Sequence, residues 1–302
     1  MDPSRRLGSD GLMRSGTKLR PALALVLNAL IWGTSWWAFR QLHEQAGLHP
    51  LWTTAGIYLM AVVVIAGSRP AAARQVLRTP ALWLIMLASG TTNATFNWGV
   101  TVGDVVRVVL LFYLMPLWAV LLARVVLKEA VTRAAMLRVA MALAGAAIVL
   151  WPEPGHPMGP LQLTDALGLI GGFSFALNNV MLRRESQRSE SSRALAMFFG
   201  GTVVSAALAL AIGAPQVPSP TFLAPGWLVF AVLLGGLFLL SNMALQYGAA
   251  RLPANATAVI MLTEVVFASG SALALGAGAL TPVLMLGGAL IIGAAVLAAL
   301  RP

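Results

Sequence analysis

The segment NATFNWG, residues 93–99, returns in altered form as NMALQYG, residues 242–248. The two segments begin 149 positions apart, and polar and aromatic residues keep their register along with the apolar ones. Further matches at the same shift join FYLMPLWA (112–119) to MLTEVVFA (261–268), and Thr132, Met136, Leu137 and Ala140 to Thr281, Met285, Leu286 and Ala289. Two Ala- and Leu-rich segments could match by composition alone, but a register that persists through polar positions favours a true internal repeat.

The composition around this repeat predicts an integral membrane protein. Hydrophobic residues make up 59% of the 302 residues and charged residues 10%, and the mean hydropathy is +0.83. A soluble domain carries about 25% charged residues, so this chain lacks the polar side chains to cover itself in water. In lipid, an apolar outer surface is the stable one. The chain has no cysteine, so we expect neither disulfides nor thiolate metal sites.

Ten segments are apolar and near the length of about 20 residues that a membrane-spanning helix needs. They cover residues 20–39, 51–67, 81–101, 105–127, 133–151, 164–182, 194–213, 226–247, 254–276 and 281–300. None of them shows the alternation that is typical of the strands of a membrane β-barrel. We therefore expect an all-α integral membrane fold of ten transmembrane helices, without a separate soluble domain.

The repeat divides these helices into two groups of five. Residues 1–19 form a basic N-terminal tail, residues 20–151 form repeat 1 with helices 1–5, and residues 152–302 form repeat 2 with helices 6–10. Because five is an odd number, the second repeat must be inverted relative to the first. Inverted repeats are common in secondary transporters, whose substrate sites lie near the bilayer midplane where the repeats meet. The pattern predicts two inverted repeats around a central cavity.

The basic residues predict the orientation. If the N-terminus lies inside, only Arg40 and Arg107 fall on the outer side, which leaves 18 of the 20 Lys and Arg residues inside. The positive-inside rule then places both termini in the cytoplasm. The basic residues that set this topology and attract anionic lipid account for the formal net charge of +10, so we expect no nucleic-acid partner.

Three segments resemble a known family, the drug/metabolite transporter (DMT) superfamily, and specifically its bacterial EamA-type transporters. They are NALIWGTSWWAFRQ (28–41), PLWAVLLARVVLKE (116–129) and YGAARLPANATAVIMLTEVVFAS (247–269). The resemblance implies ten helices, two five-helix repeats around a central cavity, and alternating access of small metabolites, often amino acids or related compounds for export. In two places the chain departs from the family pattern. Val265 replaces the usual proline after the helix-9 glutamate, and Lys128 replaces the usual glycine before the helix-4 glutamate.

The repeated segments supply the first candidates for a substrate site. Each carries two amides four residues apart, which places them on one helix face, and each has an aromatic residue directly after the second amide: Asn93, Asn97 and Trp98 in the first, Asn242, Gln246 and Tyr247 in the second. These amides could hydrogen-bond a polar or zwitterionic substrate. Alternatively, they could join neighbouring helices, with interhelical hydrogen bonds worth about 0.6 kcal/mol each.

A polar stripe in the first helix gives a second set of candidates. Asn28, Trp32 and Ser35 follow the helical period, and Asn178 lies in the corresponding helix of the second repeat. We expect these residues to face the cavity. Trp37 lies near the helix end, where tryptophans anchor helices at the membrane interface.

Helix 4 contributes candidates at two depths. Tyr113 is expected to line the cavity, beside a kink at Pro116. Arg107 lies three residues after Asp104 at the start of the helix, so the two could simply neutralise each other. The alternative is that Arg107 holds a substrate carboxylate at the outer mouth.

Glu264 is the acid in the middle of helix 9. A charged side chain at a helix centre costs roughly 2.5–3.5 kcal/mol on insertion scales, so this residue must be paired, neutral or facing water. Two interpretations stay open: a neutral acid that hydrogen-bonds a neighbouring helix and supports the fold, or a group that couples transport to protons or contacts the substrate. The family resemblance favours the structural role.

The remaining classes of function find little support. The histidines His43, His49 and His156 all fall in outer loops, so no catalytic pair or metal site forms at membrane depth. We expect a secondary transporter of the bacterial inner membrane, without cofactor or metal, that exports amino acids or related small polar metabolites. An importer or exchanger of an amine or another small organic solute is the alternative, and protons could be its coupling ion. Phosphorylated sugars fit poorly, because the helix interiors hold almost no Lys or Arg.

Overall fold

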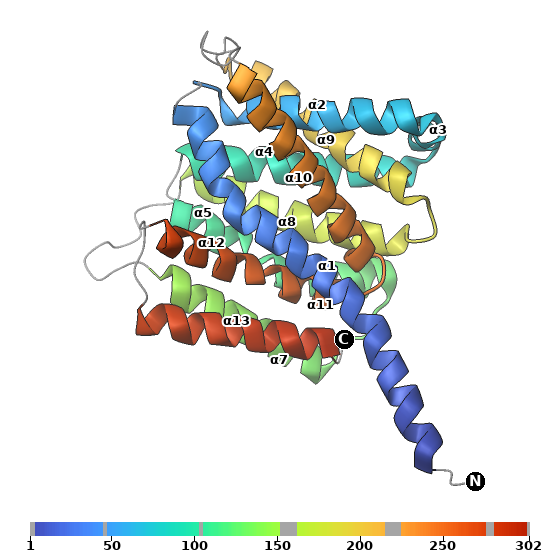
Figure 1. The fold of residues 1–302 in the computed structure, drawn as a ribbon. Coiled ribbons are helices and arrows are strands. Elements are labelled where there is room, and N and C mark those ends of the chain that lie inside the picture. Colours follow the sequence, from blue (N-terminus) through green and yellow to red (C-terminus); the bar gives the residue numbers. More distant parts are fainter. Residues whose placement is uncertain are drawn as a thin grey trace.

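The structure, a computed structural model, describes residues 4–44, 47–102, 105–151, 162–214, 225–275 and 281–300. These residues are almost entirely helical, and Figure 1 shows the helices packed side by side in one bundle. In chain order the helices are α1 (Ser4–Glu44), α2 (Pro50–Ser68), α3 (Pro70–Arg78), α4 (Pro80–Val102), α5 (Val105–Phe112), α6 (Met115–Leu122), the π-helical turn η1 (Ala123–Leu127), α7 (Arg133–Leu150), α8 (Leu163–Arg184), α9 (Glu190–Ala211), α10 (Pro225–Ala249), α11 (Ala254–Met261), α12 (Thr263–Ala274) and α13 (Pro282–Leu300). Proline opens several of them, as expected for a residue whose missing N–H group would have no partner in a first helical turn.

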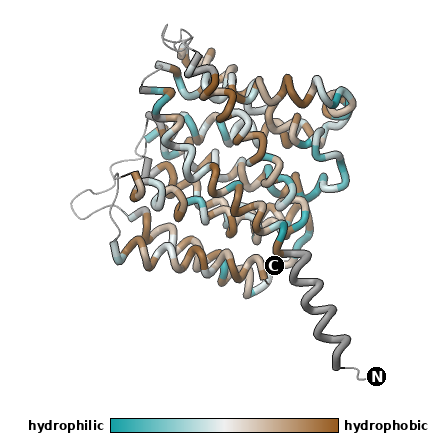
Figure 2. The backbone as a smooth tube through the Cα atoms, viewed as in Figure 1, coloured by the Kyte–Doolittle hydropathy of each residue, from teal (hydrophilic) through white to brown (hydrophobic). Residues whose placement is uncertain are grey.

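Within the described ranges, eight segments are long and apolar enough to cross a membrane. They are Leu19–His43, Pro50–Ser68, Val108–Leu127, Leu163–Arg184, Glu190–Ala211, Val229–Ala249, Ala254–Ser271 and Pro282–Leu300. Large apolar side chains such as Val63 and Leu121 remain exposed on these helices, as a lipid-facing surface requires. Figure 2 shows that hydrophobic residues are spread along the helices of the bundle. The prediction of a multi-pass membrane protein is confirmed.

Two more helices, α4 and α7, cover the other segments that the sequence predicts to span. α4 is less apolar because its second half carries Thr92, Thr95 and Asn97, all of which the bundle buries. A helix that is covered by other helices on most sides does not need an apolar surface towards lipid.

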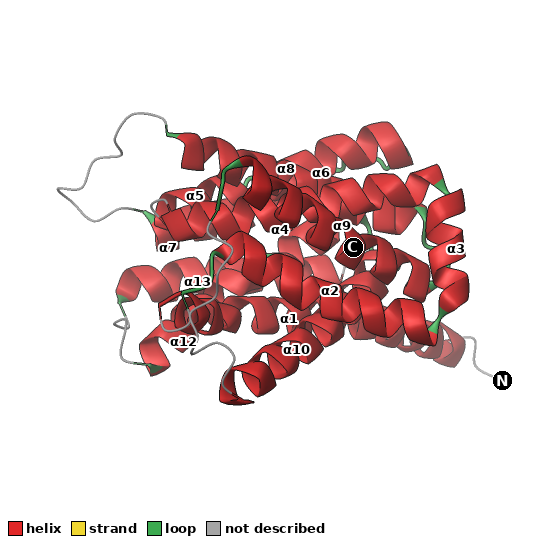
Figure 3. Cartoon of the chain, turned by 90° about the horizontal axis from the view of Figure 1, so that it is seen from above, coloured by secondary structure: helices red, strands yellow, loops and turns green. Residues whose placement is uncertain are grey.

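The structure differs from the sequence-based expectation at two places near the basic segments. α1 begins at Ser4, inside the predicted basic tail, and continues through Pro21 to Glu44. The connection between α2 and α4 contains the short helix α3, which buries Ala72 and Val76. Figure 3 shows α3 at the edge of the bundle, lying across the helix ends that it joins.

The predicted helices at 105–127 and 254–276 are each interrupted. The first breaks between α5 and α6, around Tyr113, and the second breaks at Leu262 between α11 and α12. Pro116 explains the first break, because it has no N–H group to donate and its ring clashes with the carbonyl of Phe112. The two breaks are 149 positions apart, so they coincide under the shift that superposes the repeated segments.

Glycines bring several helix pairs into backbone contact around these breaks. A Cβ atom on Gly200 of α9 would overlap the Met86 carbonyl of α4, and one on Gly172 of α8 would overlap the Phe112 carbonyl of α5. At the second break, a Cβ atom on Gly33 of α1 would lie 2.7 Å from the Glu264 carbonyl of α12. Small residues permit this close approach of membrane helices, and they hold the broken helices against the centre of the bundle.

Candidate functional site

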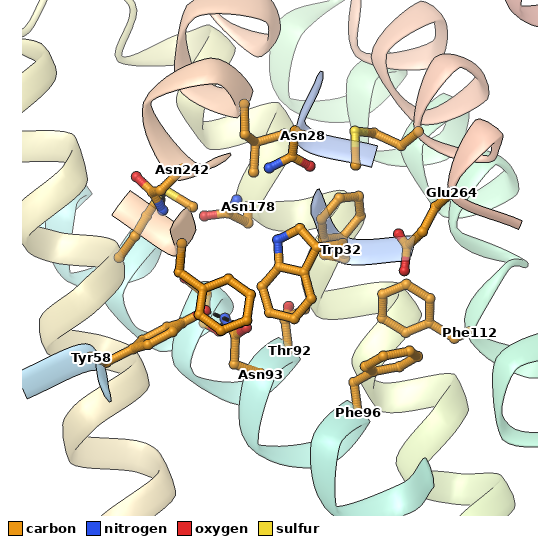
Figure 4. A pocket seen from close by; sticks show the side chains of 16 residues that line it. Asn28, Trp32, Tyr58, Thr92, Asn93, Phe96, Phe112, Asn178, Asn242 and Glu264 are labelled. Atoms are coloured by element: carbon orange, nitrogen blue, oxygen red, sulfur yellow. Dashed lines mark hydrogen bonds between the residues drawn. The ribbon is translucent and has the colours of Figure 1, made fainter. Parts of the chain in front are cut away.

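A cavity of about 60 Å³ lies in the middle of the bundle, between helices from both halves of the chain (Figure 4). This volume accommodates a few water molecules. Its lining consists of Asn28 and Trp32 from α1, Tyr58 from α2, Ser89, Thr92, Asn93 and Phe96 from α4, Phe112 from α5, Phe175 and Asn178 from α8, Met197 from α9, Phe238, Asn242 and Leu245 from α10, Met261 from α11, and Glu264 from α12. Phe112 and Met261 are the last residues of the helices that precede the two breaks. The cavity therefore lies at the level where both broken helices are interrupted.

Asn28 reaches the cavity from α1 with one side of its amide already used. Its Nδ2 atom donates to the Ser241 carbonyl at 2.8 Å and to the Ser241 hydroxyl oxygen at 2.6 Å. Because a carbonyl only accepts, this contact fixes the orientation of the amide. Its Oδ1 atom is buried and has no hydrogen-bond partner among the described residues, and the same holds for Oδ1 of Asn178.

Asn93 is held from two sides. The Tyr58 hydroxyl donates to Asn93 Oδ1 at 2.7 Å, and Asn93 Nδ2 donates to the Ser89 carbonyl one turn earlier at 2.8 Å. Tyr58 is fully packed into the core and its ring also contacts Phe198 and Phe238. A rigid aromatic neighbour thus orients the amide that α4 presents to the cavity.

Asn242 occupies the corresponding position on α10. It accepts a hydrogen bond from Gln246 Nε2 at 2.7 Å, and its Nδ2 atom contacts the Met197 sulfur at 3.5 Å. Gln246 does not line the cavity, and neither does Asn97, whose Nδ2 atom donates to the Thr54 hydroxyl at 2.7 Å. Each repeated segment therefore places its first amide at the cavity, whereas its second amide bonds within the protein: Asn97 to Thr54 of α2, and Gln246 to Asn242 of its own helix. One helical turn, about 5.4 Å, separates the two roles.

Glu264 extends towards the cavity beside Phe96 and Phe112 (Figure 4). A side-chain hydrogen bond links it to Tyr113. The sequence predicts that Tyr113 lines the cavity, but Tyr113 is not among the lining residues. It lies behind Glu264, at the break between α5 and α6. Within the described part of the chain, none of the residues that line the cavity is a lysine, arginine or histidine.

The structure places the other predicted site residues away from the cavity. Ser35 donates to the Trp32 carbonyl within its own helix at 2.8 Å, and Trp98 packs against a separate apolar cluster around Leu51. The ring of Tyr247 lies 3.8 Å below the guanidinium carbon of Arg251. The side chain of Arg107 and the whole of Asp104 lie outside the described residues, as does His156.

Sequence reasoning missed most of the apolar lining and three residues with hydroxyl groups, Tyr58, Ser89 and Thr92. The aromatic members are Phe96, Phe112, Phe175, Phe238 and Tyr58, with ring centroids 4.7 Å apart for Trp32 and Phe238 and 4.6 Å apart for Phe96 and Phe112. The repeat itself carried a signal for one of the polar ones. Thr92 precedes Asn93 as Ser241 precedes Asn242, and these two hydroxyl residues coincide at the 149-residue shift.

The comparisons with known proteins agree with this architecture. Residues 19–151 match the model of the EamA-like transporter family. This part of the chain is therefore similar to that family, which is a branch of the DMT superfamily. The resemblance seen in the sequence is thus confirmed.

The fold extends beyond the EamA-like region. A solved crystal structure with 20% sequence identity matches 92% of this chain and 96% of its own, with a TM-score of 0.75. Its fold is shared over nearly the whole length, including the half that follows the EamA-like region. Among curated proteins, none matches the chain significantly. The cavity joins both halves, because the EamA-like region supplies Asn28 and Asn93 and the rest of the chain supplies Asn178, Asn242 and Glu264.

Proposed function

We propose that this protein is a secondary transporter that exports a small nitrogen-containing metabolite, of the amino-acid or amine class, across the bacterial inner membrane by alternating access. The observation that carries the proposal is the position of the cavity. It lies in the centre of the bundle at the breaks of two helices, and both halves of the chain contribute its polar side chains. Broken helices around a central site are typical of secondary transporters.

The proposal includes ten transmembrane helices in two inverted repeats, residues 20–151 and 152–302, with both termini in the cytoplasm. The matching positions of the two helix breaks and of Asn93 and Asn242 support the repeat. The start of α1 and the end of α13 lie on the same side of the bundle in Figure 1, which is compatible with an even number of crossings. The distribution of Lys and Arg supports the orientation.

Alternating access is supported by the size of the cavity. Pockets that bind small organic ligands usually measure roughly 300–1,000 Å³, whereas this cavity measures about 60 Å³. A metabolite therefore enters only if helices or side chains around the cavity move apart. Helices that meet through glycine backbone contacts, such as α4 and α9 at Gly200, can slide with few interlocking side chains to rearrange.

Counterflow in proteoliposomes tests the transport proposal. Vesicles loaded with unlabelled substrate should take up labelled substrate transiently from outside, because a carrier exchanges solutes across the membrane. Asn93→Ala and Asn242→Ala should each reduce this uptake about tenfold or more while leaving expression near normal, since each removes an amide at the cavity. Asn255→Ala, outside the cavity lining, is the matched control. Uptake that does not depend on solute inside the vesicles would indicate a channel instead.

A further inference from the structure

The charge of the cavity lining restricts the ligands that fit it. Among the residues that the structure describes, Glu264 is the one carboxylate that lines the cavity, and no lysine, arginine or histidine lines it to balance a negative ligand. A carboxylate or phosphate placed here would lose its water shell without gaining a cationic partner, which is unfavourable in a buried site. A ligand that carries a positive charge would instead meet Glu264.

The hydrogen-bonding groups show the same preference. The amide nitrogens of Asn28, Asn93 and Asn242 already donate to protein atoms. In contrast, the buried Oδ1 atoms of Asn28 and Asn178 have no partner among the described residues. Both side chains are almost completely buried, with 1% and 2% of their surface exposed. A buried acceptor without a partner can be satisfied by a group that donates hydrogen bonds, and an ammonium group has donors only.

The rest of the lining is aromatic. Trp32 and Phe238 form one contacting pair, Phe96 and Phe112 form another, and Glu264 lies beside the second pair in Figure 4. Aromatic faces attract cations through the quadrupole of the ring, most strongly when water is excluded. They also cover the apolar part of an organic ligand.

From these three observations we propose that the cavity binds a small organic amine, whose ammonium group contacts Glu264 and whose apolar body packs among the aromatic rings. The site thereby selects amines over amino acids and carboxylic acids of the same shape. This inference rests on the proposed transport function and narrows its substrate class. Glu264 then contacts the substrate directly, with Tyr113 as the residue that positions it.

Three probes with the same aromatic ring test the charge preference on the purified wild-type protein. Phenethylamine carries only the ammonium group, phenylalanine carries both charges, and phenylacetate carries only the carboxylate. Each is measured by the rise in melting temperature with ligand concentration and by competition in counterflow. We expect phenethylamine to bind about tenfold or more tightly than phenylalanine, which corresponds to about 1.4 kcal/mol, and phenylacetate not to bind. Equal or tighter binding of phenylalanine or phenylacetate would overturn the inference.

The second arm removes the charge of Glu264. Glu264→Gln should weaken phenethylamine binding about tenfold. Glu264→Asp keeps the carboxylate, so it should weaken phenethylamine binding less than Glu264→Gln does. Glu190→Gln, at a half-exposed carboxylate that pairs with Arg251 away from the cavity, should have no effect. Unchanged amine binding by a folded Glu264→Gln protein would contradict the assigned contact. If that variant does not fold, the wild-type probe series alone decides.

The same measurements separate this inference from the transport proposal. If amino acids exchange in counterflow and amines neither exchange nor compete, the amine inference fails and the transport proposal stands. If no solute of any class exchanges in vesicles that contain folded protein, both fail.

Discussion

At the scale of single residues, buried polar side chains of this chain divide into two groups. Some bond to other side chains of the protein, as Asn97 does with Thr54 and Asn93 does with Tyr58. Others keep an open acceptor at the cavity, as Asn28 and Asn178 do. A buried polar atom without a partner costs about 1–3 kcal/mol, and a water or ligand bound in the cavity would offset this cost at Asn28 and Asn178.

Removing the Tyr58 hydroxyl tests whether a hydrogen bond of the first group, the one to Asn93, stabilises the protein. Tyr58→Phe removes the hydrogen bond to Asn93 and leaves Asn93 Oδ1 without that donor, so we expect a loss of about 1–3 kcal/mol in the free energy of unfolding and a lower melting temperature. Transport should fall as well, because Asn93 is no longer fixed at the cavity. Tyr247→Phe is the control, since the Tyr247 ring lies under Arg251 and outside the cavity lining. A Tyr58→Phe protein with unchanged melting temperature would show that this hydrogen bond adds no stability.

At the scale of elements, the breaks and ends of helices decide where the cavity forms. α5 and α11 both end at the cavity, and the chain continues as α6 and α12 after a short interruption. Pro116 explains the first interruption. The second interruption has no proline, because Val265 stands at the position that corresponds to Pro116 at the 149-residue shift. The helix nevertheless breaks at the corresponding place, Leu262. Packing therefore supports the second break, including the close approach of Gly33 to the Glu264 carbonyl.

The end of η1 supplies a test at this scale. Lys128 has φ 58° and ψ 26°, the left-handed conformation in which glycine is favoured, and its side chain is exposed. A residue with a Cβ atom pays roughly 1–2 kcal/mol to adopt it. Lys128→Gly should therefore raise the melting temperature slightly, by an amount that corresponds to at most about 1 kcal/mol. Lys128→Ala removes the same charge without the conformational relief, and it should not be stabilising. Equal melting temperatures for the two variants would show that the backbone strain here is negligible.

At the scale of the whole molecule, orientation in the membrane is the property that the basic residues control. Arg184 is the last residue of α8 and Arg188 lies in the turn between α8 and α9, on the side that also holds α3 (Figure 1). In the proposed topology of ten helices, 18 of the 20 Lys and Arg residues fall on one side, which the positive-inside rule assigns to the cytoplasm. A large excess of this kind favours one orientation over its inverse.

Single cysteines test this orientation directly, because the chain has no native cysteine to give background. Gln187→Cys places a thiol in the exposed turn between α8 and α9, and Ser219→Cys places one between α9 and α10. A membrane-impermeant maleimide added to intact cells should label position 219 and not position 187, and both should react after the membrane is opened. Labelling of position 187 in intact cells would reverse the assigned orientation.

Several features followed from the sequence alone, because they depend on properties of the chain that hold in any packing. Apolar composition determined the membrane-spanning class, Pro116 predicted a bend in its helix, and the 149-residue shift linked Asn93 to Asn242. What only the tertiary structure decided is which side chains share the cavity. Asn93 and Asn97 lie on the same face of α4, but the helices that cross it leave space beside Asn93 and fill the space beside Asn97 with Thr54. Phe96 and Phe238 read as ordinary apolar residues in the sequence, because a phenylalanine on a membrane helix can face lipid, another helix or a cavity at similar cost. Only the relative positions of several helices, set by close packing at glycines far apart in the chain, determine which of these it does.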